Sequence, residues 1–494
     1  MPTTDHTFAS TSPADNRVIG NYRLMNSEEV AEVVDRARIA GNWWRELGFA
    51  ERRKRILRFK SLLVRRAEEI AELVHAENGK PREDALLEVV LTVDHLNWAA
   101  NNAEGTLRRR SVRPGLLTLN QAATVAYQPL GVVGVIGPWN YPVFTPMGSI
   151  IYALAAGNAV VFKPSEYTTA VGEWLVQAFG EVVTEQPVLQ LATGRGDTGA
   201  ALCQTGTDKI SFTGSTATGK KVMAECADSL TPIVLECGGK DAVLVDYDAN
   251  LAKAADVVAF GAFSNAGQTC AGVELVYVHE KVADEFIQLL AERTASVRPG
   301  TAADADFGPM TMPRQIDVVH RHLDAALADG GKAVVGGTGS IHGSLISPVL
   351  LTEVPEDSAA VREETFGPVV VVNRVRDLDE AVDRANGSEY GLGASIFSGS
   401  RERMEQAASR LQVGMVSMNA WLMYAGAPAL PWGGVKQSGF GRLHGVDGLR
   451  EFARAKSTTR ERFPIPLKLT SFARHPRTTN VLLQISQLLH GRRS

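Results

Sequence analysis

The sequence predicts an α/β protein built on two sheets of mainly parallel strands. Its 494 residues are too many for one hydrophobic core, so more than one domain is expected. From residue 132 onward, short runs rich in β-branched residues alternate with helical stretches, and a second alternating series begins near residue 240. Strands that alternate with helices favour parallel sheets with helices on both faces.

The first part of the chain lacks this alternation. Residues 1–20 are polar, and we expect them to be disordered or extended. Charged helices follow to about residue 102, and the first begins with a capping signal, Asn26 with Glu29 three residues later. The segment 118–131 alternates weakly and is expected to project as a pair of strands.

The two strand series can be read residue by residue from their apolar runs. In the first series we expect strands at 132–137, 159–166, 188–193, 209–215 and 231–239, with helices over 143–157 and 217–230. In the second we expect strands at 242–246, 274–279, 332–337, 367–375, 393–398 and 414–419, with helices over 250–263, 281–296, 377–386 and 401–411.

Composition excludes several classes of protein. The formal net charge is -4 and no basic stripe dominates, which argues against a nucleic-acid partner. The four cysteines form no Cys-x-x-Cys pair, so we expect free thiols in a reducing cytoplasm. No run reaches the ~18 unbroken apolar residues of a membrane helix, and the N-terminus has no apolar signal core. The scattered histidines do not form a metal-binding motif, so no metal is expected.

The tail, residues 464–494, is basic and contains an amphipathic, helix-like segment. We expect it to pack on a neighbouring subunit. A weak contact with a membrane surface is the alternative.

A dinucleotide site is predicted where strands of the first series end, because ligands bind at the carboxyl ends of parallel strands. Gly214, Ser215 and Gly219 open a helix there, and backbone N–H groups at such a start can hold a pyrophosphate. Glu166 is placed to bind both ribose hydroxyls, and its carboxylate would repel a 2′-phosphate. This favours NAD over NADP. Lys163 is a further ribose contact, unless both residues form only a surface pair.

Three chemical groups stand at other turns. Cys270 lies among small residues in "SNAGQTCAG", as a buried structural thiol or as a nucleophile. Glu236 ends an apolar strand, as a paired acid or as a base with a raised pKa. Asn140 follows a Pro-Trp turn and offers an amide donor. A nucleophile, a base and an oxyanion donor together fit chemistry at a carbonyl, if the fold brings them together.

Taken together, these segments resemble the NAD(P)-dependent aldehyde dehydrogenase superfamily over roughly residues 20–460. The matching segments, in the family's order, are "PWNYP", "GNAVVFKPSE", "FTGSTATG", "LECGGK", "SNAGQTCAG", "EETFGPV", "YGLGASIF" and "PWGGVKQSGFGRLHGVDGLREF". The resemblance implies that Cys270 is the nucleophile, that Asn140 binds the oxyanion together with the Cys270 backbone N–H, and that Glu236 activates the hydrolytic water.

The resemblance also implies a set of cofactor contacts and a division into domains. The contacts are Ile136, Trp139, Lys163, Ser165, Glu166, Gly196, Gly214, Ser215, Gly219, Glu364 and Phe366. A Rossmann-like NAD-binding domain would comprise 1–110 and 130–238 with part of 421–454, and a catalytic domain would comprise 239–420. The strands at 111–129 and 455–463 would form a small oligomerisation arm of a homodimer or homotetramer.

Two positions depart from the family pattern. Cys237 stands where the family usually has Leu, which adds a second thiol near the site. Leu275 stands where the family often has Arg, five residues after the nucleophile. Neither departure removes a catalytic group. Cys203 and Cys226 lie in helical patterns and are interpreted as structural.

The substrate is expected to be an apolar aldehyde, aromatic or aliphatic. Carboxylated aldehydes need a cation as clamp, and residues 415–435 hold no charged residue. The predicted pocket residues are Tyr141, Phe144, Met147, Trp421, Met423, Tyr424 and Trp432, although part of this set is expected to be core. Two other functions stay open: a coenzyme A-acylating enzyme, which a hydrolytic base would handicap, and a catalytically silent structural protein, which would be free to lose Cys270.

Overall fold

The computed structural model describes residues 6–465 and 470–491. The chain divides into two compact units: Met1–Thr106 with Pro129–Arg454, and Leu107–Gln128 with Ala455–Ser494. Residues 1–5 of the expected N-terminal segment, and 466–469 and 492–494 of the expected tail, lie outside the described residues.

The larger unit begins with a hairpin and four helices. Strands β1 (Thr7–Thr11) and β2 (Val18–Arg23) pair antiparallel, so of the two alternatives for this segment the extended one is confirmed. The helices are α1 (Ser27–Glu46), α2 (Gly48–Arg65), α3 (Ala67–Asn78) and α4 (Arg82–Leu107). The predicted capping signal is confirmed, because Asn26 and Glu29 form a capping box at the start of α1.

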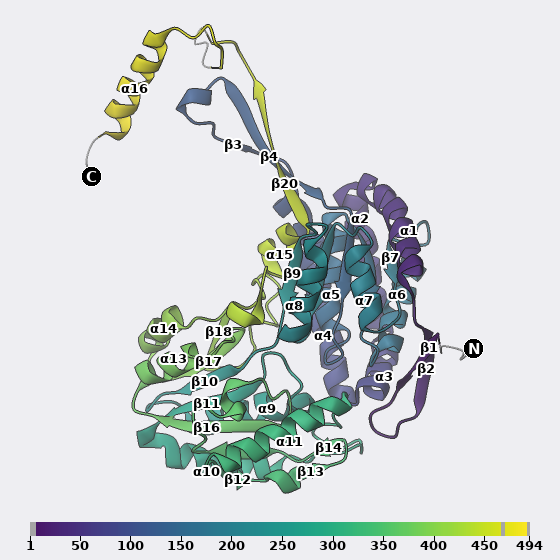
Figure 1. The fold of residues 1–494 in the computed structure, drawn as a ribbon, viewed down its shortest axis with the longest axis vertical. Helices are drawn as coiled ribbons and strands as arrows, with labels where there is room; N and C mark the ends of the chain where they lie inside the picture. Colours follow the sequence, from purple (N-terminus) through teal and green to yellow (C-terminus); the bar gives the residue numbers. More distant parts are fainter. Residues whose placement is uncertain (1–5, 466–469, 492–494) are drawn as a thin grey trace. The chain divides into compact units, whose positions relative to one another are not determined.

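The first sheet of this unit has six strands in the order β19-β9-β8-β5-β6-β7. They are β5 (Val132–Ile136), β6 (Ala159–Lys163), β7 (Leu189–Leu191), β8 (Lys209–Thr213), β9 (Ile233–Glu236) and β19 (Gly439–Phe440). Strands β5 to β9 are parallel, and β19 pairs antiparallel with β9. Helices α1, α7 (Gly196–Gln204) and α8 (Thr216–Ala227) pack on one another beside it, while α5 (Phe144–Ala156) and α6 (Thr169–Val182) pack with α2 (Figure 1).

The second sheet has seven strands in the order β12-β15-β16-β11-β10-β17-β18. They are β10 (Asp241–Val245), β11 (Val273–His279), β12 (Lys332–Val335), β15 (Val349–Thr352), β16 (Val369–Val375), β17 (Gly393–Phe397) and β18 (Met415–Met418). All pairings are parallel except that of β12 with β15. Strands β10 and β11 are buried along their whole length, as expected for parallel strands covered on both faces.

Helices and a small hairpin complete the larger unit. They are α9 (Leu251–Phe263), α10 (Ala283–Ser296), α11 (Pro313–Ala328), α12 (Ala359–Arg362), α13 (Leu378–Asn386), α14 (Arg401–Arg410) and α15 (Gly445–Glu451), with strands β13 (Ile341–His342) and β14 (Leu345–Ile346). The sequence prediction missed β15, although it lies inside the sheet, because its short run is flanked by Pro348 and Pro355. The two parallel sheets confirm the predicted α/β fold class.

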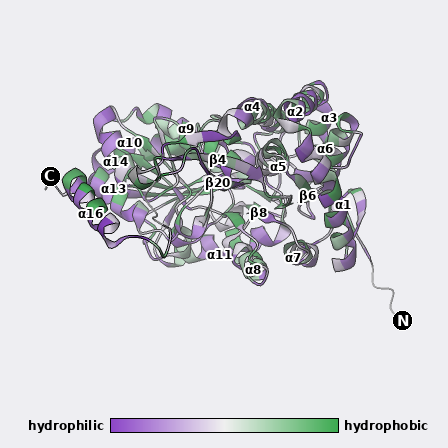
Figure 2. Cartoon of the chain, turned by 90° about the horizontal axis from the view of Figure 1, so that it is seen from above, coloured by the Kyte–Doolittle hydropathy of each residue, from purple (hydrophilic) through white to green (hydrophobic). Residues whose placement is uncertain are grey.

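Among its described residues, the smaller unit contains a three-stranded sheet, a short 3₁₀ helix (Leu116–Thr118) and an α-helix. Strands β20 (Ala453–Glu461), β4 (Gln121–Pro129) and β3 (Arg110–Val112) lie in that order. Helix α16 (Pro476–His490) has no buried residue, and hydrophobic and hydrophilic residues alternate along it (Figure 2).

Candidate active site

Both sheets of the larger unit border one cavity of about 620 Å³, the first with the carboxyl ends of its strands and the second with the amino ends. Strands β5, β6, β8 and β9 reach it with their carboxyl ends. Strands β11 and β16 begin beside it, because Cys270 precedes β11 and Glu364 and Phe366 precede β16. The chain passes from the end of β9 to the start of β10 through Gly238 and Gly239. The site is therefore assembled where one sheet ends and the other begins.

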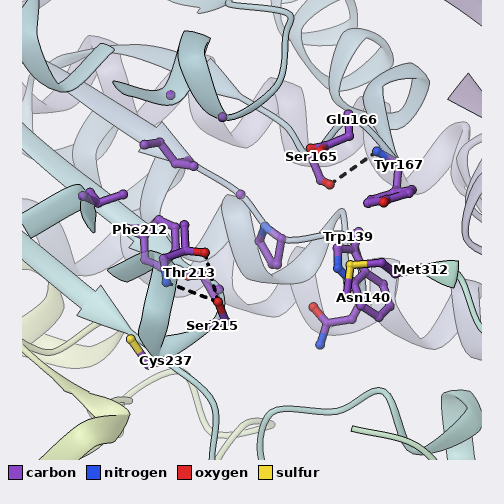
Figure 3. A pocket seen from close by; sticks show the side chains of 18 of the residues that line it. Trp139, Asn140, Ser165, Glu166, Tyr167, Phe212, Thr213, Ser215, Cys237 and Met312 are labelled. Atoms are coloured by element: carbon purple, nitrogen blue, oxygen red, sulfur yellow. Dashed lines mark hydrogen bonds between the residues drawn. The ribbon is translucent and has the colours of Figure 1, made fainter. Parts of the chain in front are cut away.

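Segments that follow strands of the first sheet line the cavity with polar side chains such as Ser165, Glu166 and Ser215 (Figure 3). Gly196 is the first residue of α7, and Ser215 caps α8 by accepting a hydrogen bond from the Thr218 N–H, at 3.3 Å. Two helix starts at one cavity suit an anionic group such as a pyrophosphate. The buried Lys163 ends β6 and Glu166 follows it, and both line the cavity. Burial lowers the pKa of Lys163, although the charge of Glu166 opposes the shift.

The structure brings every predicted cofactor residue except Gly219 to the cavity. The lining includes Ile136, Trp139, Lys163, Ser165, Glu166, Gly196, Gly214, Ser215, Glu364 and Phe366. Gly219 instead lies one turn into α8, where a Cβ would approach the Cys237 Sγ to 3.0 Å. Its lack of a side chain serves packing between α8 and β9.

Several lining residues carried no strand-end signal in the sequence. Arg195, Lys221 and Arg314 add three cations to the cavity, and Tyr167 and Met312 add apolar surface. Arg195 directly precedes α7. Its position next to Gly196 was the one feature of the sequence that could have predicted it as a lining residue. Arg314 lies in α11, a helix that the strand series did not include.

The loop that carries Cys270 has a strained backbone. Asn265, Ala266 and Gly267 are consecutive residues with φ of 52°, 57° and 69°. A left-handed conformation costs a non-glycine residue roughly 1–2 kcal/mol. Gly267 is required at its position, because a Cβ there would lie 2.2 Å from the Gly367 carbonyl oxygen. These turns bring Cys270 to the cavity wall with partial exposure.

The Cys270 thiol is surrounded by acids. Burial raises its pKa well above the ordinary value, and the charges of Glu236, Asp241 and Glu364 raise it further. The resting side chain is therefore a thiol, and a base must take its proton before it can attack.

Glu236 is a buried carboxyl at the end of β9. Its Oε1 accepts a hydrogen bond from the Trp432 indole N–H, and its Oε2 accepts one from the Thr213 hydroxyl, at 3.4 Å. Burial raises the pKa of Glu236 to about 7, and the two hydrogen bonds oppose that rise. A carboxyl with this pKa can accept a proton near neutral pH. It is absent from the lining of the cavity, whereas the next residue, Cys237, is part of it.

Asn140 faces the loop of the nucleophile. Its Nδ2 donates to the Gln268 carbonyl oxygen at 3.0 Å, two residues before Cys270. Asn265 links the same two segments, because its Nδ2 donates to the carbonyl oxygens of Asn140 at 3.1 Å and of Gln268 at 3.3 Å. Both Asn140 and Cys270 line the cavity.

Glu364 is held over a glycine. Its Oε1 accepts a hydrogen bond from the Gly239 N–H at 3.1 Å, and a Cβ on Gly238 would overlap the carboxylate. Burial and the charge of Glu274 raise the pKa of Glu364 to about 8. Glu274 also accepts hydrogen bonds from the backbone N–H groups of Thr365 and Phe366, at 2.8 and 2.9 Å.

The predicted substrate residues lie outside this cavity, and two of them form hydrogen bonds with the nucleophile loop. Trp421 donates to the Ala271 carbonyl oxygen at 2.9 Å, and the Tyr141 hydroxyl lies 3.0 Å from the Thr269 hydroxyl. Burial raises the pKa of Tyr141 and of Tyr424, and the charge of Cys270 contributes to both shifts.

The others differ in position. Phe144 packs edge-on against His95 with a ring distance of 5.1 Å, Met147 is buried, and Met423 is 66% exposed.

The other cysteines, and Leu275 at the second position that departs from the family pattern, are all buried. All four cysteines are free thiols. Cys237 lines the cavity, and burial raises its pKa to about 12, so it is a poor nucleophile near neutral pH. Leu275 is buried within β11. Cys203 and Cys226 are buried.

The part of the chain that the structure describes contains no group of three or more histidine, cysteine or acidic side chains able to hold a metal. No helix within the described ranges is long and apolar enough to cross a membrane.

Known proteins were compared with the chain as a whole. A family model described as "Aldehyde dehydrogenase family" matches residues 1–458. The chain is 38% identical over 462 residues to 4,4'-diapolycopene aldehyde oxidase of a Methylomonas species, an alignment that covers 93% of this chain and 87% of that protein. It is 35% identical over 436 residues to a putative NADP⁺ succinate-semialdehyde dehydrogenase of Mycobacterium ulcerans, with 87% and 84% covered.

Solved structures give the same result. NADP-dependent glyceraldehyde-3-phosphate dehydrogenase from Bacillus halodurans, complexed with NADP, superposes with a TM-score of 0.88 at 33% identity, covering 93% of this chain and 97% of that one. NAD-dependent aldehyde dehydrogenase from Sinorhizobium meliloti superposes with a TM-score of 0.89 at 30% identity, covering 94% and 93%. The chain therefore belongs to the aldehyde dehydrogenase family, whose members are nicotinamide-dependent oxidoreductases that oxidise aldehydes.

Proposed function

We propose that this protein oxidises an apolar aldehyde to the carboxylic acid, with NAD as cofactor and Cys270 as nucleophile. The observation that carries the proposal is the meeting of three groups at one junction: the Cys270 thiol, the Asn140 amide bonded to the loop before it, and the Glu236 carboxyl whose charge acts on the thiol. Nucleophile, oxyanion donor and base are the parts that acyl chemistry needs.

Each residue has a defined task in this reaction. Glu236 takes the Cys270 proton, and the thiolate attacks the aldehyde carbon to form a thiohemiacetal. The Asn140 Nδ2 has a second N–H beyond the one given to Gln268, and it donates to the developing oxyanion. A bound nicotinamide supplies the hydride acceptor. After releasing that proton to solvent, Glu236 deprotonates the water that cleaves the Cys270 thioester. The leaving Cys270 thiolate then takes this second proton from Glu236, which releases the acid and restores the thiol.

The direct test is turnover with a panel of aldehydes, measured as NADH absorbance. Cys270→Ala should abolish turnover, because it removes the nucleophile. Cys226→Ala is the matched control, since it deletes a buried thiol outside the cavity and should leave turnover unchanged. Turnover that survives in Cys270→Ala would refute the mechanism. An inactive wild type with both NAD and NADP would favour the silent structural alternative.

The preference for NAD rests on Glu166. Its carboxylate lines the cavity after β6, where it would repel a 2′-phosphate. The relatives include NAD- and NADP-dependent proteins, and the cations Arg195 and Lys221 in the same cavity would attract a phosphate. Glu166→Gln should therefore lower KM for NADP more than KM for NAD. An unchanged ratio of the two KM values would mean that Glu166 does not select the cofactor.

The preference for an apolar substrate rests on the residues bound to the nucleophile loop. Trp421 and Tyr141 form hydrogen bonds with it, the charge of Cys270 acts on Tyr424, and segment 415–435 has no charge. The relative named for 4,4'-diapolycopene aldehyde is consistent with this preference, whereas the relatives named for succinate semialdehyde are not. Octanal and benzaldehyde should give higher kcat/KM than succinate semialdehyde. The reverse order would overturn the substrate class.

Coenzyme A distinguishes the acylating alternative. Glu236, with a pKa near 7, favours attack by water, so adding coenzyme A should leave the rate and the acid product unchanged. Formation of an acyl-coenzyme A would support the acylating reaction instead.

We further propose the following assembly. Residues 1–110 and 130–238, with part of 421–454, bind the cofactor, and 239–420 form the catalytic domain. The strands at 111–129 and 455–463 join subunits of a homodimer or homotetramer. Free, buried cysteines suit a reducing cytoplasm. The molar mass from sedimentation tests the oligomeric state.

A further inference from the structure

Lys80 and Glu88 form an ion pair that is entirely removed from solvent, and its polar contacts converge on the loop of Asn140. The Lys80 Nζ lies 2.8 Å from the Glu88 Oε2, and both side chains have zero exposure. Lys80 follows α3 and Glu88 lies in α4, so neither belongs to a strand end or to the cavity lining. A buried pair is not in itself stabilising, since desolvation offsets the attraction. Stability alone therefore does not explain why this ion pair also contacts the loop of Asn140.

The Lys80 ammonium contacts three groups. One of its N–H groups donates to Glu88, a second donates to the Asn140 carbonyl oxygen at 2.8 Å, and the Nζ lies 3.9 Å from the centre of the Tyr141 ring. Lys80 thus contacts two consecutive residues of the loop, Asn140 and Tyr141. The Asn140 carbonyl also accepts a hydrogen bond from Asn265, so the orientation of this peptide is set on two sides.

The Glu88 carboxylate holds the exit of the same loop. Its Oε1 accepts hydrogen bonds from the backbone N–H groups of Val143 and Phe144, at 2.7 and 2.9 Å. These residues are the N-cap and first residue of α5, and Val143 has no side-chain cap of its own. Glu88 is therefore a remote cap for the helix that starts where the loop ends.

We propose that Lys80 and Glu88 are positioning residues, which hold the Asn140 amide where it meets the oxyanion. The Asn140 side chain and the carbonyl that Lys80 binds belong to the same residue, so a shift at the carbonyl moves the amide. Misplacement of a reacting group by about 1 Å can lower a rate ~100-fold. The inference rests on the proposed function, in which Asn140 is the oxyanion donor.

The test compares a paired variant in two backgrounds. Lys80→Met/Glu88→Gln removes both charges together, which avoids leaving one buried ion unpaired. The amide that replaces the Glu88 carboxylate keeps a carbonyl oxygen able to cap α5, so the main loss is the Lys80 contact with Asn140. We expect kcat to fall about tenfold or more in the wild-type background, with KM for NAD unchanged. In an Asn140→Ala background the same pair should change kcat less than about twofold, because the amide is already absent.

The matched control is the pair Lys209→Met/Glu451→Gln. Lys209 donates to Glu451 at 2.6 Å, and it lies at the amino end of β8, away from the cavity. This control should leave kcat unchanged. Equal losses from the Lys80 pair in both backgrounds would mean that it acts independently of Asn140, which would overturn the proposal.

A structural measurement keeps the two proposals distinguishable. Crystal structures of the wild type and the Lys80→Met/Glu88→Gln variant give the distance from the Asn140 Nδ2 to the Gln268 carbonyl oxygen directly. We expect this bond, 3.0 Å here, to be lost in the variant. If the bond is retained, the positioning role is wrong, whatever the activity. An inactive wild type would refute the proposed function alone, because this measurement needs no turnover.

Discussion

The loop of Cys270 and the loop of Asn140 face the same cavity but are held by different forces. The Cys270 loop takes its turn from its own backbone, with three left-handed residues in succession and a bond from the Gln268 N–H to the Asn265 carbonyl at 3.1 Å, although Asn140 and Trp421 also donate hydrogen bonds to it. The Asn140 loop is held by side chains from α4 and the end of α3. Local strain shapes the first loop, and remote ion pairing shapes the second.

This difference has a physical consequence. A loop that depends on its own backbone is sensitive to a change at one of its residues. A loop that is held by side chains from other segments is sensitive to substitutions far from it in sequence. We expect the variants below to test this difference between the two loops, in decreasing order of effect.

The largest effect is expected from Gly267→Ala. The new Cβ would meet the Gly367 carbonyl oxygen at 2.2 Å, at a φ of 69° that disfavours a side chain. The loop must rearrange, and kcat should fall ~100-fold or more. Gly105→Ala is the control, because a Cβ at this exposed position in α4 meets nothing within 4 Å. Steady-state kinetics and thermal unfolding should show a loss only for Gly267→Ala. Near-normal kcat would mean that the strain is not needed.

A smaller effect is expected at Asn265, which joins the two loops. Asn265→Gly keeps the tolerance for φ of 52° but removes both hydrogen bonds to the carbonyl oxygens of Asn140 and Gln268. Asn265→Ala removes the bonds and adds strain.

We expect kcat to fall about tenfold in Asn265→Gly, and further in Asn265→Ala. The difference between the two variants measures the backbone strain, and the loss in Asn265→Gly measures the link between the loops. If Asn265→Gly has wild-type kcat, the loops are positioned independently.

The smallest effect is expected from Trp432→Phe, which acts on a group outside both loops. The indole N–H donates to Glu236 and favours the carboxylate, so its loss raises the pKa of Glu236 above about 7. The base works only when ionised, so the acidic limb of the kcat–pH profile should move upward by about one unit. Activity at pH 7 should fall and should recover at higher pH.

Trp421→Phe is the control for that experiment. It removes an indole of equal size whose N–H donates to the Ala271 carbonyl oxygen, so the acidic limb should stay in place. A pH profile that is unchanged in Trp432→Phe would show that this hydrogen bond does not tune the base.

Some features of the molecule could be predicted from the sequence because they depend on local patterns. The alternating apolar runs predict the parallel sheets, and strand ends predict the cavity through residues such as Glu166 and Ser215. The Asn26–Glu29 capping box was predictable for the same reason. Small residues around Cys270 also mark a turn, since left-handed backbone favours Asn and Gly.

Other features depend on contacts between distant segments. The bond from Trp432 to Glu236 joins residues 196 positions apart in the sequence. It opposes the rise that burial causes in the pKa of Glu236, which lies at about 7. Arg314 reaches the cavity from α11, which had no strand-end signal, and β15 completes its sheet despite flanking prolines.

The fold class, the family and the strand-end residues of the cavity could be predicted because periodicity and motif order are properties of the chain. How those residues are held, and how their pKa values are set, depends on contacts that form only in the folded protein. Lys80 and Glu88 have no local signature, since an ion pair is identified by the partners it is buried against. The pKa of Glu236 likewise follows from burial and two hydrogen bonds, which form only when β8, β9 and the segment of Trp432 lie together.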